Sequence, residues 1–128
     1  MPSDPIELSD ILIVEDVDAM RELVAQVVEG LGFVRVSGKA RNCWEARLEL
    51  SRRRPALVLL DEVLPGESGL DLLNEILEEG IPVLLLTGMD DPHHPVPSGA
   101  SGRLIKPGWD TFEADCERFR TALAQILP

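Results

Sequence analysis

Short, unbroken apolar runs alternate along the chain with stretches whose apolar residues recur every three or four positions. The apolar runs lie at 11–14, 56–60 and 83–86, with shorter ones near 33–36 and 104–105. Unbroken runs of this length are typical of parallel strands covered on both faces, and the periodic stretches are typical of amphipathic helices. The alternation therefore predicts crossover units that build one parallel sheet.

The periodic stretches predict helices with recognisable ends. Polar or small residues suit the starts of the first three: Asp18, Asn42, and Ser68 or Gly69. Glycines are expected to end the first and the third, at Gly30 and Gly80. Apolar residues between 109 and 126 repeat at intervals of three and four, which predicts an amphipathic helix at the end of the sequence.

The segment between the fourth and fifth predicted strands breaks this pattern. It contains Pro92, Pro95, Pro97, Gly99 and Gly102, which leave no room for a helix of normal length. We predict a loop, or at most one helical turn. An irregular crossover covers its sheet face less well than a helix, and this leaves apolar surface available to a partner or a second copy.

Composition narrows the classes of function. The 128 residues fit one domain, and 23 acidic against 12 basic residues give a net charge of -11. Nucleic-acid binding needs a clustered positive surface, so this charge favours cations or basic partners instead. The two cysteines lack metal-ligand spacing, no signal region opens the chain, and its apolar runs are too short for a membrane span. We therefore expect a cytoplasmic protein that binds neither nucleic acid nor membrane.

Carboxylates follow two of the predicted strands. Glu15 and Asp16 come directly after the first, and Asp61 stands at the end of the third. Parallel strands deliver their carboxyl ends to one edge of the sheet, so the three acids are expected to meet. Two unit charges ~4 Å apart repel by about 4 kcal/mol at an effective dielectric of 20. A cation is therefore expected between them.

Two donors are expected at the same edge. Thr87 ends the fourth strand and Lys106 follows the fifth, which places a hydroxyl and an ammonium near the acids. Carboxylates suit a hard divalent cation such as Mg²⁺, which commonly bridges protein oxygens to a phosphoryl group. An aspartate can also act as a nucleophile that becomes an acyl phosphate. The set predicts phosphoryl transfer, with Asp61 as the attacking group.

Over nearly its full length the chain resembles a bacterial two-component response regulator receiver domain. The matching features are Glu15-Asp16 after 11–14, Asp61 followed by Leu64-Pro65-Gly66 and Gly69-Leu70, Thr87 after 83–86, and Lys106-Pro107. The resemblance implies an α/β, flavodoxin-like three-layer sandwich. Its five-stranded parallel sheet would have the order 2-1-3-4-5, with the fourth helix degenerate or missing. We expect one receiver domain over 1–128, with 1–8 as an N-terminal extension and no effector domain.

The resemblance also implies roles for the residues at the edge. Asp61 would accept a phosphoryl group from a sensor histidine kinase or a phosphotransfer protein. Mg²⁺ would be held by Asp16, Asp61 and the backbone carbonyl of Val63, with Glu15 acting mainly through water. The residues that would contact the phosphoryl group and carry the switch are Thr87 and Lys106.

The same resemblance implies a protein that is not an enzyme but assists its own phosphorylation and dephosphorylation. It would act by protein contact, as a monomer or weak homodimer, with an unknown downstream target. Arg103 stands where the family usually has an aromatic residue, so the switch is expected to be altered.

Other interpretations remain open. A pseudo-receiver would bind partners without accepting phosphate. A phosphatase of the haloacid dehalogenase type would need a second acid two residues after Asp61, where Val63 stands. Four further residues are expected to have ordinary roles. His93 and His94 are interpreted as solvated loop residues rather than metal ligands, and Trp44 and Trp109 as packing residues.

Overall fold

The computed structural model describes residues 8–64, 69–88 and 96–127. Strands and helices alternate in its first part: β1 (Ser9–Val14), α1 (Asp18–Glu29), β2 (Val34–Ala40), α2 (Cys43–Arg52), β3 (Leu57–Asp61), α3 (Gly69–Glu78) and β4 (Val83–Thr87). The remaining elements are β5 (Gly102–Ile105), a 3-10 turn η1 (Trp109–Thr111) and α4 (Phe112–Ile126). The third strand ends at Asp61, as predicted.

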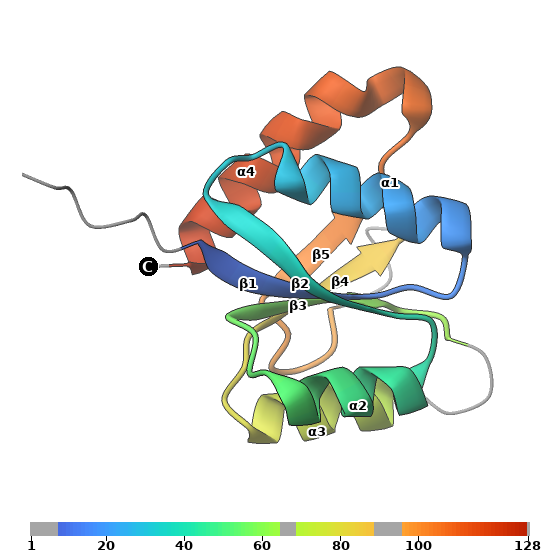
Figure 1. Cartoon of the computed structure of the whole chain (residues 1–128), viewed down its shortest axis with the longest axis vertical. Helices are drawn as coiled ribbons and strands as arrows, with labels where there is room; N and C mark the ends of the chain where they lie inside the picture. Colours follow the sequence, from blue (N-terminus) through green and yellow to red (C-terminus); the bar gives the residue numbers. More distant parts are fainter. Residues whose placement is uncertain (1–7, 65–68, 89–95, 128) are drawn as a thin grey trace, which may run out of the picture.

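The strands form one parallel sheet in the order β2-β1-β3-β4-β5, which confirms the predicted topology. Helices α1 and α4 cover one face of the sheet and α2 and α3 the other (Figure 1). The register pairs Val14 with Leu60, Asp61 with Leu86 and Thr87 with Ile105. The carboxyl ends of β1, β3, β4 and β5 therefore lie at a common edge.

Each central strand sends alternate residues into two separate cores. On β1, Ile11 and Ile13 pack toward α1 and α4, while Leu12 and Val14 pack toward α2 and α3. All four side chains are almost completely buried. Burying one aliphatic side chain stabilises the fold by about 1.5–3 kcal/mol. An apolar residue is therefore favoured at positions that face either core. This explains why the strands appear as unbroken apolar runs.

One of the predicted helix caps is present and another is not. The Asn42 side chain accepts a hydrogen bond from the Glu45 N–H at 2.8 Å, as a capping residue should. The prediction that Asp18 caps α1 is wrong, because Val17 is the N-cap and Asp18 is already inside the helix. There its carboxylate pairs with Arg21 at 2.5 Å, one turn along, and still faces the positive end of the helix dipole.

The two tryptophans are not packing residues, contrary to the prediction. Trp44 is 67% exposed and Trp109 is 66% exposed. Helix α2 faces the sheet with the small residues Cys43 and Ala46, which leaves Trp44 outside. Trp109 lies in η1, before α4 begins, so the periodicity of that helix does not position it.

Strand β2 carries an irregularity where it pairs with β1. The pairing moves from Ile11 with Val36 to Leu12 with Gly38, so Ser37 has no opposite residue. The Ser37 hydroxyl donates to the Ile11 carbonyl at 3.4 Å. A β-carbon on Gly38 would come within 2.7 Å of a Glu49 carboxylate oxygen and 3.1 Å of a Leu12 methyl, so a larger residue would require these side chains to shift.

The described part of the fourth crossover, residues 88 and 96–101, contains no helix. This agrees with the predicted irregular crossover. The predictions on the 65–66 turn, on His93 and His94, and on most of the N-terminal extension concern residues outside the described ranges. Val96 and Leu70 are exposed. Among the described helices, none has both the length and the apolar character needed to cross a membrane.

Candidate functional site

Three acids meet at the carboxyl edge of the sheet, as predicted. Glu15 and Asp16 follow β1 and Asp61 ends β3, and one carboxylate oxygen from each lies within 4.8 Å of the others. Glu15 and Asp61 are buried, whereas Asp16 is exposed. The Glu15 N–H donates to the Ala40 carbonyl of β2 at 2.9 Å, which fixes the backbone of the acid pair.

A lysine ammonium lies between the two buried acids. Lys106 Nζ is 3.0 Å from Glu15 Oε1 and 3.2 Å from Asp61 Oδ2. The Lys106 N–H donates to the Thr87 carbonyl at 2.7 Å, so the end of β4 positions the lysine. The expected cation between the acids is therefore supplied here by a side chain.

Burial and mutual contacts shift the proton affinities of this group. Burial raises the pKa of Glu15 to about 8, and its hydrogen bond with Asp61 adds to the rise. Burial also opposes ionisation of Asp61, but hydrogen bonds from Glu15 and the Val63 N–H and the charge of Lys106 lower its pKa overall. Burial opposes the charge of Lys106, yet the two acids raise its pKa overall. The surroundings thus favour the ionised form of Asp61 and the protonated form of Glu15.

The donor set fits a hard divalent cation. Mg²⁺ prefers carboxylate oxygens and keeps part of its water shell, and the exposed Asp16 gives the group an open side. Burial and the neighbouring Asp61 raise the pKa of Glu15, so added positive charge at this group is favoured. A bound cation would favour the ionised form of Glu15 instead.

The remaining predicted residues lie close by. Val63 donates its N–H to Asp61 Oδ1 at 3.0 Å, and its side chain is 78% exposed. Thr87 is the last residue of β4, beside Ile105. The structure therefore brings all the predicted site residues except Arg103 around Asp61, while Arg103 lies on β5 and pairs with Glu62.

Two further residues support the edge and were not predicted. Glu62 contacts Arg103, and Arg21 donates to the Glu15 carbonyl at 3.0 Å. The Glu62 contact joins residues 41 positions apart, so no local sequence signal reveals it. Arg21 stands three residues after Asp18, a spacing that brings side chains together on a helix and was the available signal.

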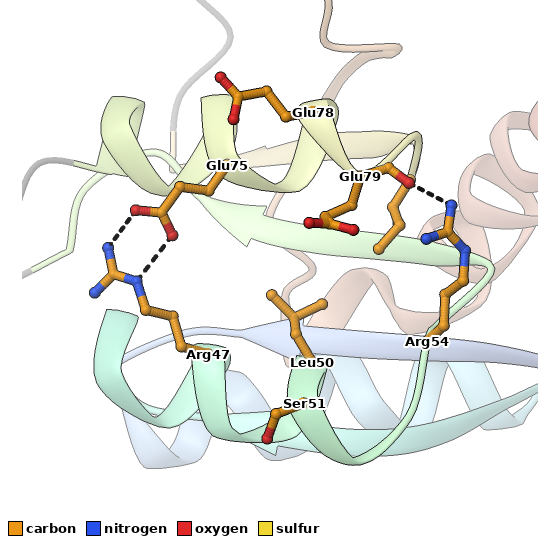
Figure 2. Close-up of a pocket in the computed structure, with 8 residues that line it drawn as sticks. Arg47, Leu50, Ser51, Arg54, Glu75, Glu78 and Glu79 are labelled. Atoms are coloured by element: carbon orange, nitrogen blue, oxygen red, sulfur yellow. Dashed lines mark hydrogen bonds and ion pairs between the residues drawn. The ribbon is translucent and has the colours of Figure 1, made fainter.

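A larger hollow of about 520 Å³ lies between α2 and α3, away from these acids (Figure 2). Arg47 bridges it with two hydrogen bonds of 2.9 Å to Glu75, and Arg54 donates to the Glu79 carbonyl. Its two arginines are thus engaged across the groove (Figure 2). No residue of the acid site lines it.

Comparison with known families gives a match to the response regulator receiver domain over residues 11–111. The chain is 33% identical over 104 residues to the phosphate regulon transcriptional regulatory protein PhoB of Pseudomonas aeruginosa, covering 76% of this chain and 44% of that protein. It is 36% identical over 102 residues to the DNA-binding response regulator MtrA of Mycobacterium tuberculosis, covering 76% and 43%. The chain thus spans less than half the length of these relatives.

Solved structures show the same fold. The response regulator domain of Thermotoga maritima CheB superposes with a TM-score of 0.81 at 19% identity, covering 94% of this chain and 96% of that one. CheY6 of R. sphaeroides, in a structure with the P1 domain of CheA3, gives a match with a TM-score of 0.74 at 26% identity, covering 91% and 97%. These similarities agree with the observed strand order.

Proposed function

Because the chain belongs to the response regulator receiver domain family, we propose that it accepts a phosphoryl group on Asp61 and passes the signal on by protein contact. The donor would be a sensor histidine kinase or a phosphotransfer protein. The observation that supports this best is a buried, ionised Asp61 in contact with Lys106, with the oxygens of Glu15 and Asp16 nearby.

In the transfer itself, the protein mainly positions the reacting groups and neutralises charge on the phosphoryl oxygens. An Asp61 carboxylate oxygen attacks phosphorus, the bond from phosphorus to the donor histidine nitrogen breaks, and that nitrogen keeps the electron pair. The Lys106 ammonium, already 3.2 Å from Asp61 Oδ2, neutralises charge on the arriving oxygens. Thr87 would contact the same oxygens from the end of β4.

Mg²⁺ would be held by Asp16, Asp61 and the Val63 carbonyl, with Glu15 acting mainly through water, and would neutralise the phosphoryl oxygens. Glu15 would release its proton as the metal binds, because a nearby cation favours the carboxylate. Metal binding should also raise the melting temperature, since it stabilises only the folded chain.

The proposal is tested by incubating the protein with acetyl phosphate and Mg²⁺ and measuring its intact mass. We expect up to one phosphoryl group per chain on the unaltered protein and none on Asp61→Asn. Asp71→Asn, which changes an exposed aspartate of α3, is the matched control and should label normally. Full labelling of Asp61→Asn would move the acceptor elsewhere.

The pseudo-receiver is the second candidate, and the replacement of the usual aromatic residue by Arg103 favours it. It predicts no labelling and partner binding that does not depend on Asp61. The family match gives no support to the phosphatase alternative, which predicts repeated turnover of a phosphate ester. The same incubation therefore separates the three functions.

A further inference from the structure

An ion pair beside Asp61 is not used by the chemistry above. Glu62 directly follows Asp61, while Arg103 lies on β5, two strands away in the sheet. The Arg103 guanidinium contacts Glu62 Oε1. A pair of opposite charges thus spans β4 and ends next to the phosphoryl acceptor.

The pair is shielded from water, unlike the ion pairs on the helix surfaces. The side chains of Arg103 and Glu62 are 12% and 17% exposed. By comparison, Arg52 in its pair with Glu49 is 71% exposed, so solvent screens that contact. Charges act more strongly where water is excluded, because the effective dielectric is lower.

Asp61 and Glu62 border a cavity whose other lining residues are mostly apolar. Arg103 is the register partner of Leu85 on β4. This cavity of about 100 Å³ is lined by Asp61, Glu62 and the largely apolar set Leu60, Gly69, Leu70, Leu73, Leu85 and Pro97. Glu62 directly follows Asp61 and lines the same cavity, so the two residues share one poorly solvated region. A change in charge at position 62 or 103 should therefore be felt at the acceptor.

We propose that Arg103 is a positioning residue that strengthens the hold of Asp61 on its phosphoryl group by neutralising Glu62. The inference rests on the proposed function. A phosphoryl group adds negative charge to an edge that already gathers three acids. With Arg103 in place, the neighbouring Glu62 adds no uncompensated charge. Without it, Glu62 adds an uncompensated negative charge next to the acceptor.

This mechanism makes the two single substitutions act in opposite directions. Arg103→Gln leaves Glu62 uncompensated and should weaken binding of beryllofluoride, a phosphoryl mimic, by roughly five-fold in the presence of Mg²⁺. Glu62→Gln removes a negative charge near Asp61 while the charge of Arg103 remains, and should tighten that binding by roughly the same factor. The double variant should bind as the unaltered protein does. Isothermal titration calorimetry measures each affinity.

Control variants separate a local electrostatic role from a general effect of breaking an ion pair. The matched controls, Arg47→Gln and Glu75→Gln, break an arginine–glutamate pair between α2 and α3 and should leave the affinity unchanged (Figure 2).

The outcomes are distinguishable. If the unaltered protein binds beryllofluoride and takes label from acetyl phosphate, but both single variants shift the affinity in the same direction or not at all, the role of Arg103 is wrong and the proposed function stands. If the unaltered protein neither binds nor labels, the proposed function is wrong and this inference is lost with it.

Discussion

At β5, the two faces of the sheet are covered by different kinds of contact. Toward α1 and α4, Leu104 is buried in the same core as Phe119 and Leu123. Toward α2 and α3, the neighbouring residue Arg103 pairs with Glu62 instead of packing under a helix. The long carbon stem of an arginine can cover apolar surface while its charged end finds a partner. A charged pair can therefore cover the edge of a sheet face where the described residues of the crossover form no helix.

The sharpest test of this comparison is to remove the largest fully buried side chain, which lies on the face covered by α1 and α4. Phe119 is completely buried, so Phe119→Ala should lower the free energy of unfolding by about 3–5 kcal/mol. Leu70→Ala, which changes an exposed residue on the other face, should change it by about 0.5 kcal/mol or less. Urea denaturation measures both. Equal losses would contradict the burial of Phe119 and the exposure of Leu70.

The acidic edge, where both faces end, provides a second test. Glu15 keeps its proton in the folded protein up to a pKa of about 8, against 4.5 for the ordinary group, so the folded state binds more protons between these values. The stability of the metal-free protein should therefore fall as pH rises from about 4.5 to about 8. The lowered pKa of Asp61 acts below this window and the raised pKa of Lys106 above it.

Thermal unfolding in a chelator across this pH range measures the effect. Glu15→Gln, which cannot ionise, should remove most of the slope, and saturating Mg²⁺ should reduce it because the metal favours the carboxylate. A flat profile for the unaltered, metal-free protein would contradict the assigned protonation of Glu15.

The smallest expected effect on the free energy of unfolding concerns the pair of Glu62 and Arg103. Replacing a shielded ion pair with apolar residues is often neutral or stabilising, whereas removing one partner leaves a charge uncompensated. The double variant Glu62→Leu, Arg103→Leu should therefore unfold within about 1 kcal/mol of the unaltered protein. Arg103→Leu alone should be less stable than the double variant. A large loss in the double variant would show that the pair is required for this face to form.

The fold could be predicted because the strongest signals were local. Strands buried on both faces need apolar residues at every position, and prolines and glycines mark the crossover in which the described residues form no helix. The acid site was predictable for a related reason. The topology of a parallel sheet alone brings Asp16, Asp61 and Lys106 to one edge.

The details that could not be predicted depend on contacts between residues far apart in the sequence, or on a helix that starts one residue away from the expected position. Asp18 is a good capping residue, but α1 begins one position too early for it to act as the N-cap. Trp44 follows the expected helical period, yet the residues that α2 buries are the smaller Cys43 and Ala46. The pairing of Glu62 with Arg103 required knowing how β5 lies across β4 from β3.

The unpaired Ser37 has a consequence for how the protein behaves at high concentration. Strand β2 is an outer strand of the sheet, and such strands offer free backbone groups to any other chain that can lie alongside. An extra residue bends a strand and increases its twist, so β2 is a poor template for an incoming strand. The irregularity therefore makes edge-to-edge pairing through β2 less favourable.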